Sequence, residues 1–113
     1  MRQTGRTTKN LIKLAHHASQ SVDKYYFISP NSEMSKIAFN MFLKMFSECI
    51  IDQTHRAHLS VVLHGGSSIM FVFESFVNDE MYLGATPRKY ICDHDTYVTS
   101  HHFIFSNKDI SNV

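Results

Sequence analysis

Residues 25–34 read YYFISPNSEM, a short aromatic and aliphatic run followed directly by residues typical of a helix start. The aromatic and β-branched side chains of residues 25–29 favour an extended strand. Pro30 interrupts that strand, and Asn31 and Ser32 are residue types that cap the amino end of helices. The stretch therefore predicts a strand that leads straight into a helix, which is the building unit of α/β domains.

The helix expected at residues 33–50 is apolar on nearly every side. A helix that packs on one face of a sheet buries an apolar stripe a little over 100° wide. Phe39, Leu43 and Phe46 follow at spacings of four and three, and we expect these surplus residues to form an exposed face. Such a face would anchor a homodimer or a protein partner. Alternatively, the segment around residues 103–105 covers it within the same chain.

The remaining pattern extends this unit in both directions. Leu11, Ala15, Ala18 and Val22 recur at helical spacing and predict a helix at about residues 7–21, after a tight loop at Gly5. Further strands are expected at the ranges 59–64, 69–74, 89–93 and 102–105, the first two joined as a hairpin by Gly65, Gly66, Ser67 and Ser68. The predicted fold is one α/β domain, residues 1–113, with a β-hairpin and a sheet of two or three layers.

Composition excludes several classes of protein. The 113 residues are 43% hydrophobic and 19% charged, with a formal net charge of +1, which argues against disorder and against a uniformly basic nucleic-acid-binding chain. Cys49 and Cys92 are too far apart for a CxxC pair. No apolar run approaches the roughly 20 residues of a membrane span. We expect a cytoplasmic protein (in the host cytoplasm if viral) with no membrane partner.

Two short motifs carry chemistry. Gly5, Arg6, Thr7 and Thr8 precede the first helix, and a glycine loop there presents free backbone N–H groups to phosphate. Arg6 adds a side chain that binds phosphate in bidentate fashion. The alternative interpretation is an ordinary capped helix start behind a flexible tail.

The second motif is Asp93, at the end of the hydrophobic strand 89–93. A carboxylate at the carboxyl edge of a parallel sheet is well placed to coordinate magnesium. The alternative is a polar turn that simply ends the strand. Zinc or manganese would need nitrogen and oxygen ligands, and no regular spacing favours that site over solvated histidines. Its candidate ligands are Asp93, His94, Asp95, His101 and His102.

The order and spacing of these motifs resemble the front half of the P-loop NTPase core of phage terminase large subunits and helicases. The chain is most similar to small phage-type proteins that carry only this part. Residues 27–34 resemble the strand and helix after the phosphate loop, 69–72 the terminase hairpin, and 83–88 the connection before the Walker B strand. The resemblance covers about residues 3–97.

The resemblance implies a function and a set of site residues. Gly5, Arg6, Thr7 and Thr8 would bind phosphate, with the Thr7 hydroxyl on the magnesium side. Asp93 would hold Mg²⁺, with His94 and Asp95 beside it, and the cofactor would be ATP or another nucleotide. The chain lacks the first glycine of the loop, has Arg6 in place of lysine, and has His94 in place of glutamate. With these departures, the resemblance implies binding of a nucleotide or of nucleic-acid phosphate with little or no hydrolysis, at most a weak NTPase activity.

Two further hypotheses remain open. The first is a non-enzymatic interaction or inhibitor protein that acts on host or defence machinery through the apolar helix 33–50. The second is nucleic-acid binding through basic residues that meet at one edge of the sheet, against the alternative of a solvated basic face. Its candidate residues are Arg2, Arg6, Lys9, Lys13, Arg88 and Lys89.

Overall fold

The computed structural model describes residues 2–75, 89–93 and 108–110. Within these ranges two helices, α1 (Arg2–Gln20) and α2 (Ser32–Phe46), pack with a sheet. The strands are β1 (Lys24–Ser29), β2 (Ile51–His55), β3 (Ser60–Leu63), β4 (Ser68–Phe73), β5 (Lys89–Cys92) and β6 (Lys108–Asp109), and a short 3₁₀ turn, η1 (Arg56–His58), follows β2.

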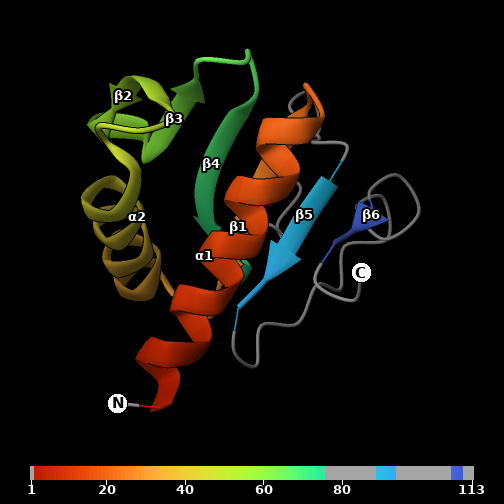
Figure 1. Ribbon diagram of the computed structural model, residues 1–113. Coiled ribbons are helices and arrows are strands. Elements are labelled where there is room, and N and C mark those ends of the chain that lie inside the picture. Colours follow the sequence, from red (N-terminus) through yellow and green to blue (C-terminus); the bar gives the residue numbers. More distant parts are fainter. Residues whose placement is uncertain (1, 76–88, 94–107, 111–113) are drawn as a thin grey trace.

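The six strands form one mixed sheet in the order β2-β3-β4-β1-β5-β6 (Figure 1). β1 pairs in parallel with β4 on one side and with β5 on the other, and β6 continues in the same direction. β3 runs antiparallel to both of its neighbours, β2 and β4. The α/β class and the hairpin are therefore confirmed. The hairpin turn needs glycine at position 66, because Gly66 has a φ of 103°.

Both helices cover the same face of the sheet (Figure 1). Phe27, Ile69, Phe71 and Ile91 point from the central strands into the core on this face. The described part of the chain therefore forms a two-layer domain, one of the two expected arrangements. The residues that α1 contributes to the core are spaced along one side of the helix: Leu11, Leu14, Ala15 and Ala18.

α2 begins as its sequence predicts. The Asn31 side chain caps the helix by accepting the backbone N–H of Met34 at 2.9 Å. The helix ends at Phe46, four residues before the expected boundary. Its buried face follows helical spacing and consists of Ser35, Ala38, Phe39, Phe42 and Leu43.

The prediction of an exposed face at Phe39, Leu43 and Phe46 is wrong. Phe39 is 2% exposed and Leu43 is 8% exposed, and Phe46 is partly buried against the same core. The reason is that α2 lies over the aromatic centre of the sheet, where the Phe39 ring is 5.6 Å from that of Phe71. The exposed apolar residue of this helix is instead Ile37, which is 52% exposed. A partner of the chain stays a prediction.

Two other local expectations need correction. α1 begins at Arg2, so Gly5 lies within a helix and not in a loop before it. One glycine costs a helix only about 1 kcal/mol, and the buried residues further along α1 hold it in place. β2 was not expected, because this edge strand has a single buried residue, Ile51, and shows no alternating pattern. The strand expected at residues 102–105 lies outside the described residues.

Candidate functional site

The carboxyl ends of the parallel strands β4, β1 and β5 lie at one edge of the sheet, the lower edge in Figure 1. From β1 the chain proceeds through α2 to strands on one side of β1, whereas β5 lies on the other side. Open α/β sheets bind ligands outside the carboxyl ends of strands, where the strand order reverses in this way. That place lies beyond the adjoining carboxyl ends of β1 and β5.

Asp93 lies at this place. It directly follows β5, and its backbone N–H donates to the carbonyl of Ile28 on β1 at 2.8 Å. The residue is only 1% exposed. Burying a carboxylate is costly unless hydrogen bonds compensate for the lost water. Its donors are therefore the central feature of the site.

Two side chains of α1 donate to the Asp93 carboxylate. Thr7 Oγ1 donates to Oδ2 at 2.7 Å, and Asn10 Nδ2 donates to Oδ1 at 2.8 Å. Thr7 and Asn10 are three positions apart, so they lie on the same side of the helix. The site therefore joins residues separated by 86 positions in the sequence. Asp93 therefore lies at the carboxyl end of a strand, as expected, and Thr7 contacts it from within α1 and not from a loop at Gly5.

The first motif does not form a phosphate loop in this structure. Gly5, Arg6, Thr7 and Thr8 all lie in the first turns of α1. In a regular helix only the first four N–H groups lack a carbonyl partner, so the backbone N–H groups of Thr7 and Thr8 are occupied. What this segment offers a ligand is the positive end of the helix.

Ser29 adds a polar group that sequence reasoning missed. It is the last residue of β1, fully buried, and its Oγ has no hydrogen-bond partner. The parallel register pairs Ile28 with Cys92, which places Ser29 level with Asp93. Buried hydroxyl groups are normally hydrogen-bonded, so an orphaned one calls for an explanation. The sequence signal that could have identified Ser29 is its position, as a polar residue at the end of a buried strand.

The amino end of α2 reaches the same edge of the sheet. The helix starts three residues after β1, and Ser35 Oγ donates to the carbonyl of Val72 on β4 at 2.6 Å. Both helices therefore direct their positive ends toward the carboxyl ends of the strands (Figure 1). This arrangement favours an anionic ligand at that edge.

Other predicted site residues are placed elsewhere or not described. Lys89 lies at the opposite edge, 3.9 Å from Asp23, so it does not join Arg2 and Arg6 at one edge of the sheet. Within residues 2–75, 89–93 and 108–110, no three His, Cys, Asp or Glu side chains are grouped to hold a metal ion. His94, Asp95, His101, His102 and Arg88 lie outside the described residues.

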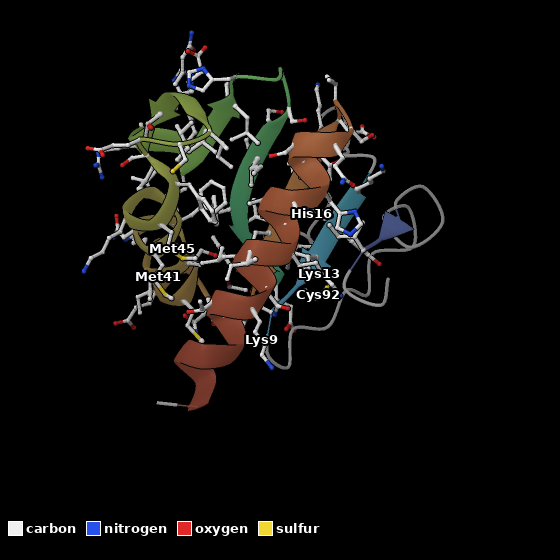
Figure 2. The ribbon with its side chains drawn as sticks, viewed as in Figure 1. Lys9, Lys13, His16, Met41, Met45 and Cys92 are labelled. Carbon is white, nitrogen blue, oxygen red and sulfur yellow. The ribbon has the colours of Figure 1, made fainter. Side chains whose placement is uncertain are left out.

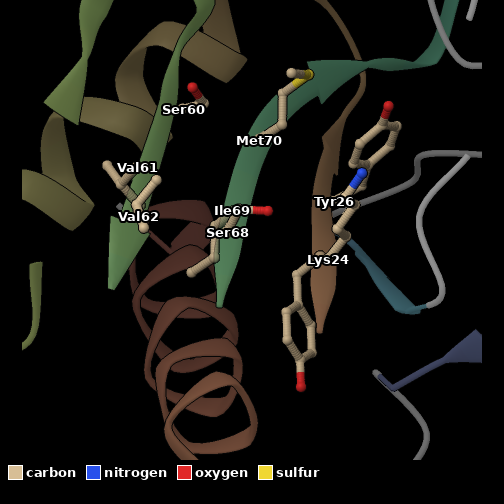
Figure 3. A pocket seen from close by; sticks show the side chains of 9 residues that line it. Lys24, Tyr26, Ser60, Val61, Val62, Ser68, Ile69 and Met70 are labelled. Carbon is tan, nitrogen blue, oxygen red and sulfur yellow. The ribbon is translucent and has the colours of Figure 1, made fainter. Parts of the chain in front are cut away.

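A cavity of about 180 Å³ lies away from Asp93, on the other face of the sheet (Figure 3). It is lined by the first halves of β1 and β4 and by β3, with Tyr26, Met70 and Val62 among its walls. Burial raises the pKa of the Tyr26 hydroxyl. The cavity is separate from the carboxyl edge, since its lining contains none of Asp93, Thr7, Asn10 and Ser29.

Comparisons with known proteins give no further guide. No family model, no curated protein and no solved structure matches the chain. Among the described helices, none has the length and hydrophobicity needed to cross a membrane.

Proposed function

We propose that this chain binds the phosphate groups of a nucleotide at the carboxyl edge of its sheet, with little or no hydrolysis. The observation that supports this most is the 2.7 Å hydrogen bond between Thr7 and Asp93. It brings together a hydroxyl and a carboxylate at the reversal of strand order, where α/β sheets take ligands.

The chemistry of these groups suits a phosphate ligand accompanied by Mg²⁺. Asp93 alone would repel phosphate, but a carboxylate and a hydroxyl are the hard oxygen ligands that Mg²⁺ accepts beside water and phosphate. The carboxylate has about four acceptor sites, and Thr7 and Asn10 both donate to it. Bound Mg²⁺ would neutralise charge on the phosphate oxygens. Because Asp93 is 1% exposed, we expect ligand binding to displace Thr7 or Asn10 from the carboxylate.

The same residues argue against efficient hydrolysis. Phosphoryl transfer depends on charge stabilisation and on a positioned water molecule. Arg6 replaces the usual lysine, and His94 follows Asp93 where an ATPase has a glutamate. We expect negligible phosphate release from ATP. Robust release that Asp93→Ala abolishes would contradict this, and the double change Arg6→Lys and His94→Glu tests whether activity can be restored.

The direct test is thermal denaturation and calorimetry with ATP, GTP and ADP, each with and without Mg²⁺. A nucleotide at 100 times its Kd stabilises the folded state by about 2.7 kcal/mol. Asp93→Asn keeps the shape of the side chain and removes its charge, so this variant should lose the Mg²⁺-dependent stabilisation.

Ser67→Ala is the matched control. It removes a buried hydrogen bond at the opposite edge of the sheet and should keep the response to nucleotide. Equal stabilisation of wild type and Asp93→Asn, or no stabilisation of wild type by any nucleotide, would reject the proposal.

A further inference from the structure

The positive charge of the chain is concentrated on α1. This helix carries Arg2, Arg6, Lys9 and Lys13 and no acidic residue, and the first acidic residue of the chain is Asp23. The rest of the chain has seven Lys or Arg residues and ten Asp or Glu residues. A chain with a net charge of only +1 therefore presents one strongly basic helix.

The four basic residues occupy one side of α1. Their spacings of four, three and four keep them on one face, because successive residues of a helix are about 100° apart. This face is opposite the buried residues Leu11, Leu14 and Ala18. Lys9 is exposed, Lys13 is half-buried, and His16 continues the spacing and is exposed. Figure 2 shows Lys9, Lys13 and His16 following one another along the helix.

We propose that this basic face of α1 binds the phosphate backbone of a nucleic-acid duplex, without sequence preference. At 1.5 Å per residue, positions 2 to 13 span about 16 Å. One strand of a duplex carries a phosphate about every 3.4 Å along the axis, so the face can follow about five phosphates. α1 contains no Phe, Tyr or Trp for stacking on unpaired bases, which favours a duplex over a single strand.

A membrane surface and a second copy of the chain fit this face less well. A membrane-surface helix inserts its apolar side into lipid, but Leu11 and Leu14 are fully buried in the core of this domain. Ile12, 50% exposed, is the one large apolar side chain that α1 exposes among its described residues. A second copy would bring two basic helices together and repel. Nucleic acid therefore matches the face best.

The test is fluorescence anisotropy of a labelled duplex DNA of mixed sequence, without nucleotide and at several salt concentrations. With up to four phosphate contacts, the logarithm of the binding constant should fall against the logarithm of salt with a slope of about −3 to −4. Binding should weaken about 100-fold between 50 and 200 mM salt. Lys9→Gln should reduce the slope by about one, and Lys9→Glu should weaken binding about 10-fold or more at low salt.

Lys36→Glu on α2 is the matched control, because Lys36 is also exposed and its replacement changes the net charge equally. It should leave duplex binding nearly unchanged, and circular dichroism should show that both variants are folded. No duplex binding, or an equal loss in both variants, would overturn the inference. Binding to phosphatidylserine vesicles in preference to duplex would also overturn it. The binding assay contains no nucleotide, so its outcome does not depend on the function proposed for Asp93.

Discussion

The two ends of α1 are attached to the sheet by different chemistry. At the amino edge of the sheet, Tyr25 and Ser67 donate their hydroxyl groups to main-chain carbonyls at the end of the helix, among them those of Ala18 and Ser21. At the carboxyl edge, a buried carboxylate, Asp93, accepts from side chains within the helix.

The attachment at the amino edge is fully explained by the fold. The last four carbonyls of a helix lack partners within it, and buried hydroxyl groups satisfy some of them. The attachment at the carboxyl edge has no such explanation, because Thr7 and Asn10 lie inside the helix and a neutral residue would avoid the cost of burying a charge. This difference is why Asp93, and not Tyr25 or Ser67, is the functional candidate.

The largest effect is expected from Asp93→Ala. Hydrogen bonds to charged groups contribute about 1.5–3 kcal/mol each, so losing both should lower the free energy of unfolding by about 3–6 kcal/mol. Urea denaturation measures this directly. A loss below about 1 kcal/mol would mean that the carboxylate contributes little to attaching α1.

A smaller loss is expected from Ser67→Ala at the amino edge. Ser67 Oγ lies 2.8 Å from the carbonyl of Ala18 and 2.9 Å from that of Ser21. Neutral hydrogen bonds contribute less, so we expect a loss of about 1–2 kcal/mol in urea denaturation. Ser68→Ala is the control at the neighbouring, half-buried position. If Ser67→Ala costs as much as Asp93→Ala, the two attachments do not differ as described.

Tyr25→Phe should remove about 1 kcal/mol at neutral pH and also change the response to alkali. Burial, chiefly, raises the pKa of Tyr25 above its ordinary value of 10.0, so the folded state holds the phenolic proton more tightly than the unfolded state. The resulting stability is fully present below pH 10 and is lost as the pH rises through the higher folded pKa. Unfolding free energies measured from pH 8 to 11.5 should therefore fall less steeply for Tyr25→Phe than for wild type. Parallel curves would contradict this.

The smallest effect, and a gain, is expected from Gly5→Ala. A Cβ atom at Gly5 would meet nothing within 4 Å, and the residue lies inside α1. Alanine should stabilise the helix by about 0.5–1 kcal/mol. The melting temperature measures the gain, and nucleotide titration shows whether binding survives. Loss of binding in a more stable variant would mean that the bound state needs Gly5 in a loop.

Local sequence determined most of the secondary structure. The strand β1, the cap and start of α2, the β3–β4 hairpin and β5 follow from side-chain periodicity and from Pro30, Asn31 and the Gly65–Gly66 pair. These signals act over a few residues, so they do not depend on the rest of the chain. That Thr7 and Asp93 belong to one site was also expected, but through a resemblance to P-loop proteins and not through local pattern.

Only the tertiary structure decided which apolar and polar residues are buried. An all-round apolar helix does not reveal which side meets the sheet, and packing placed Phe39 and Leu43 inside and Ile37 outside. The position of α1 brings Asn10 to Asp93, and strand register places Ser29 level with Asp93. A weak local signal at Gly5 was overridden by the burial of Leu11 and Leu14, because burying a large side chain contributes about 1.5–3 kcal/mol and one helical glycine costs about 1 kcal/mol.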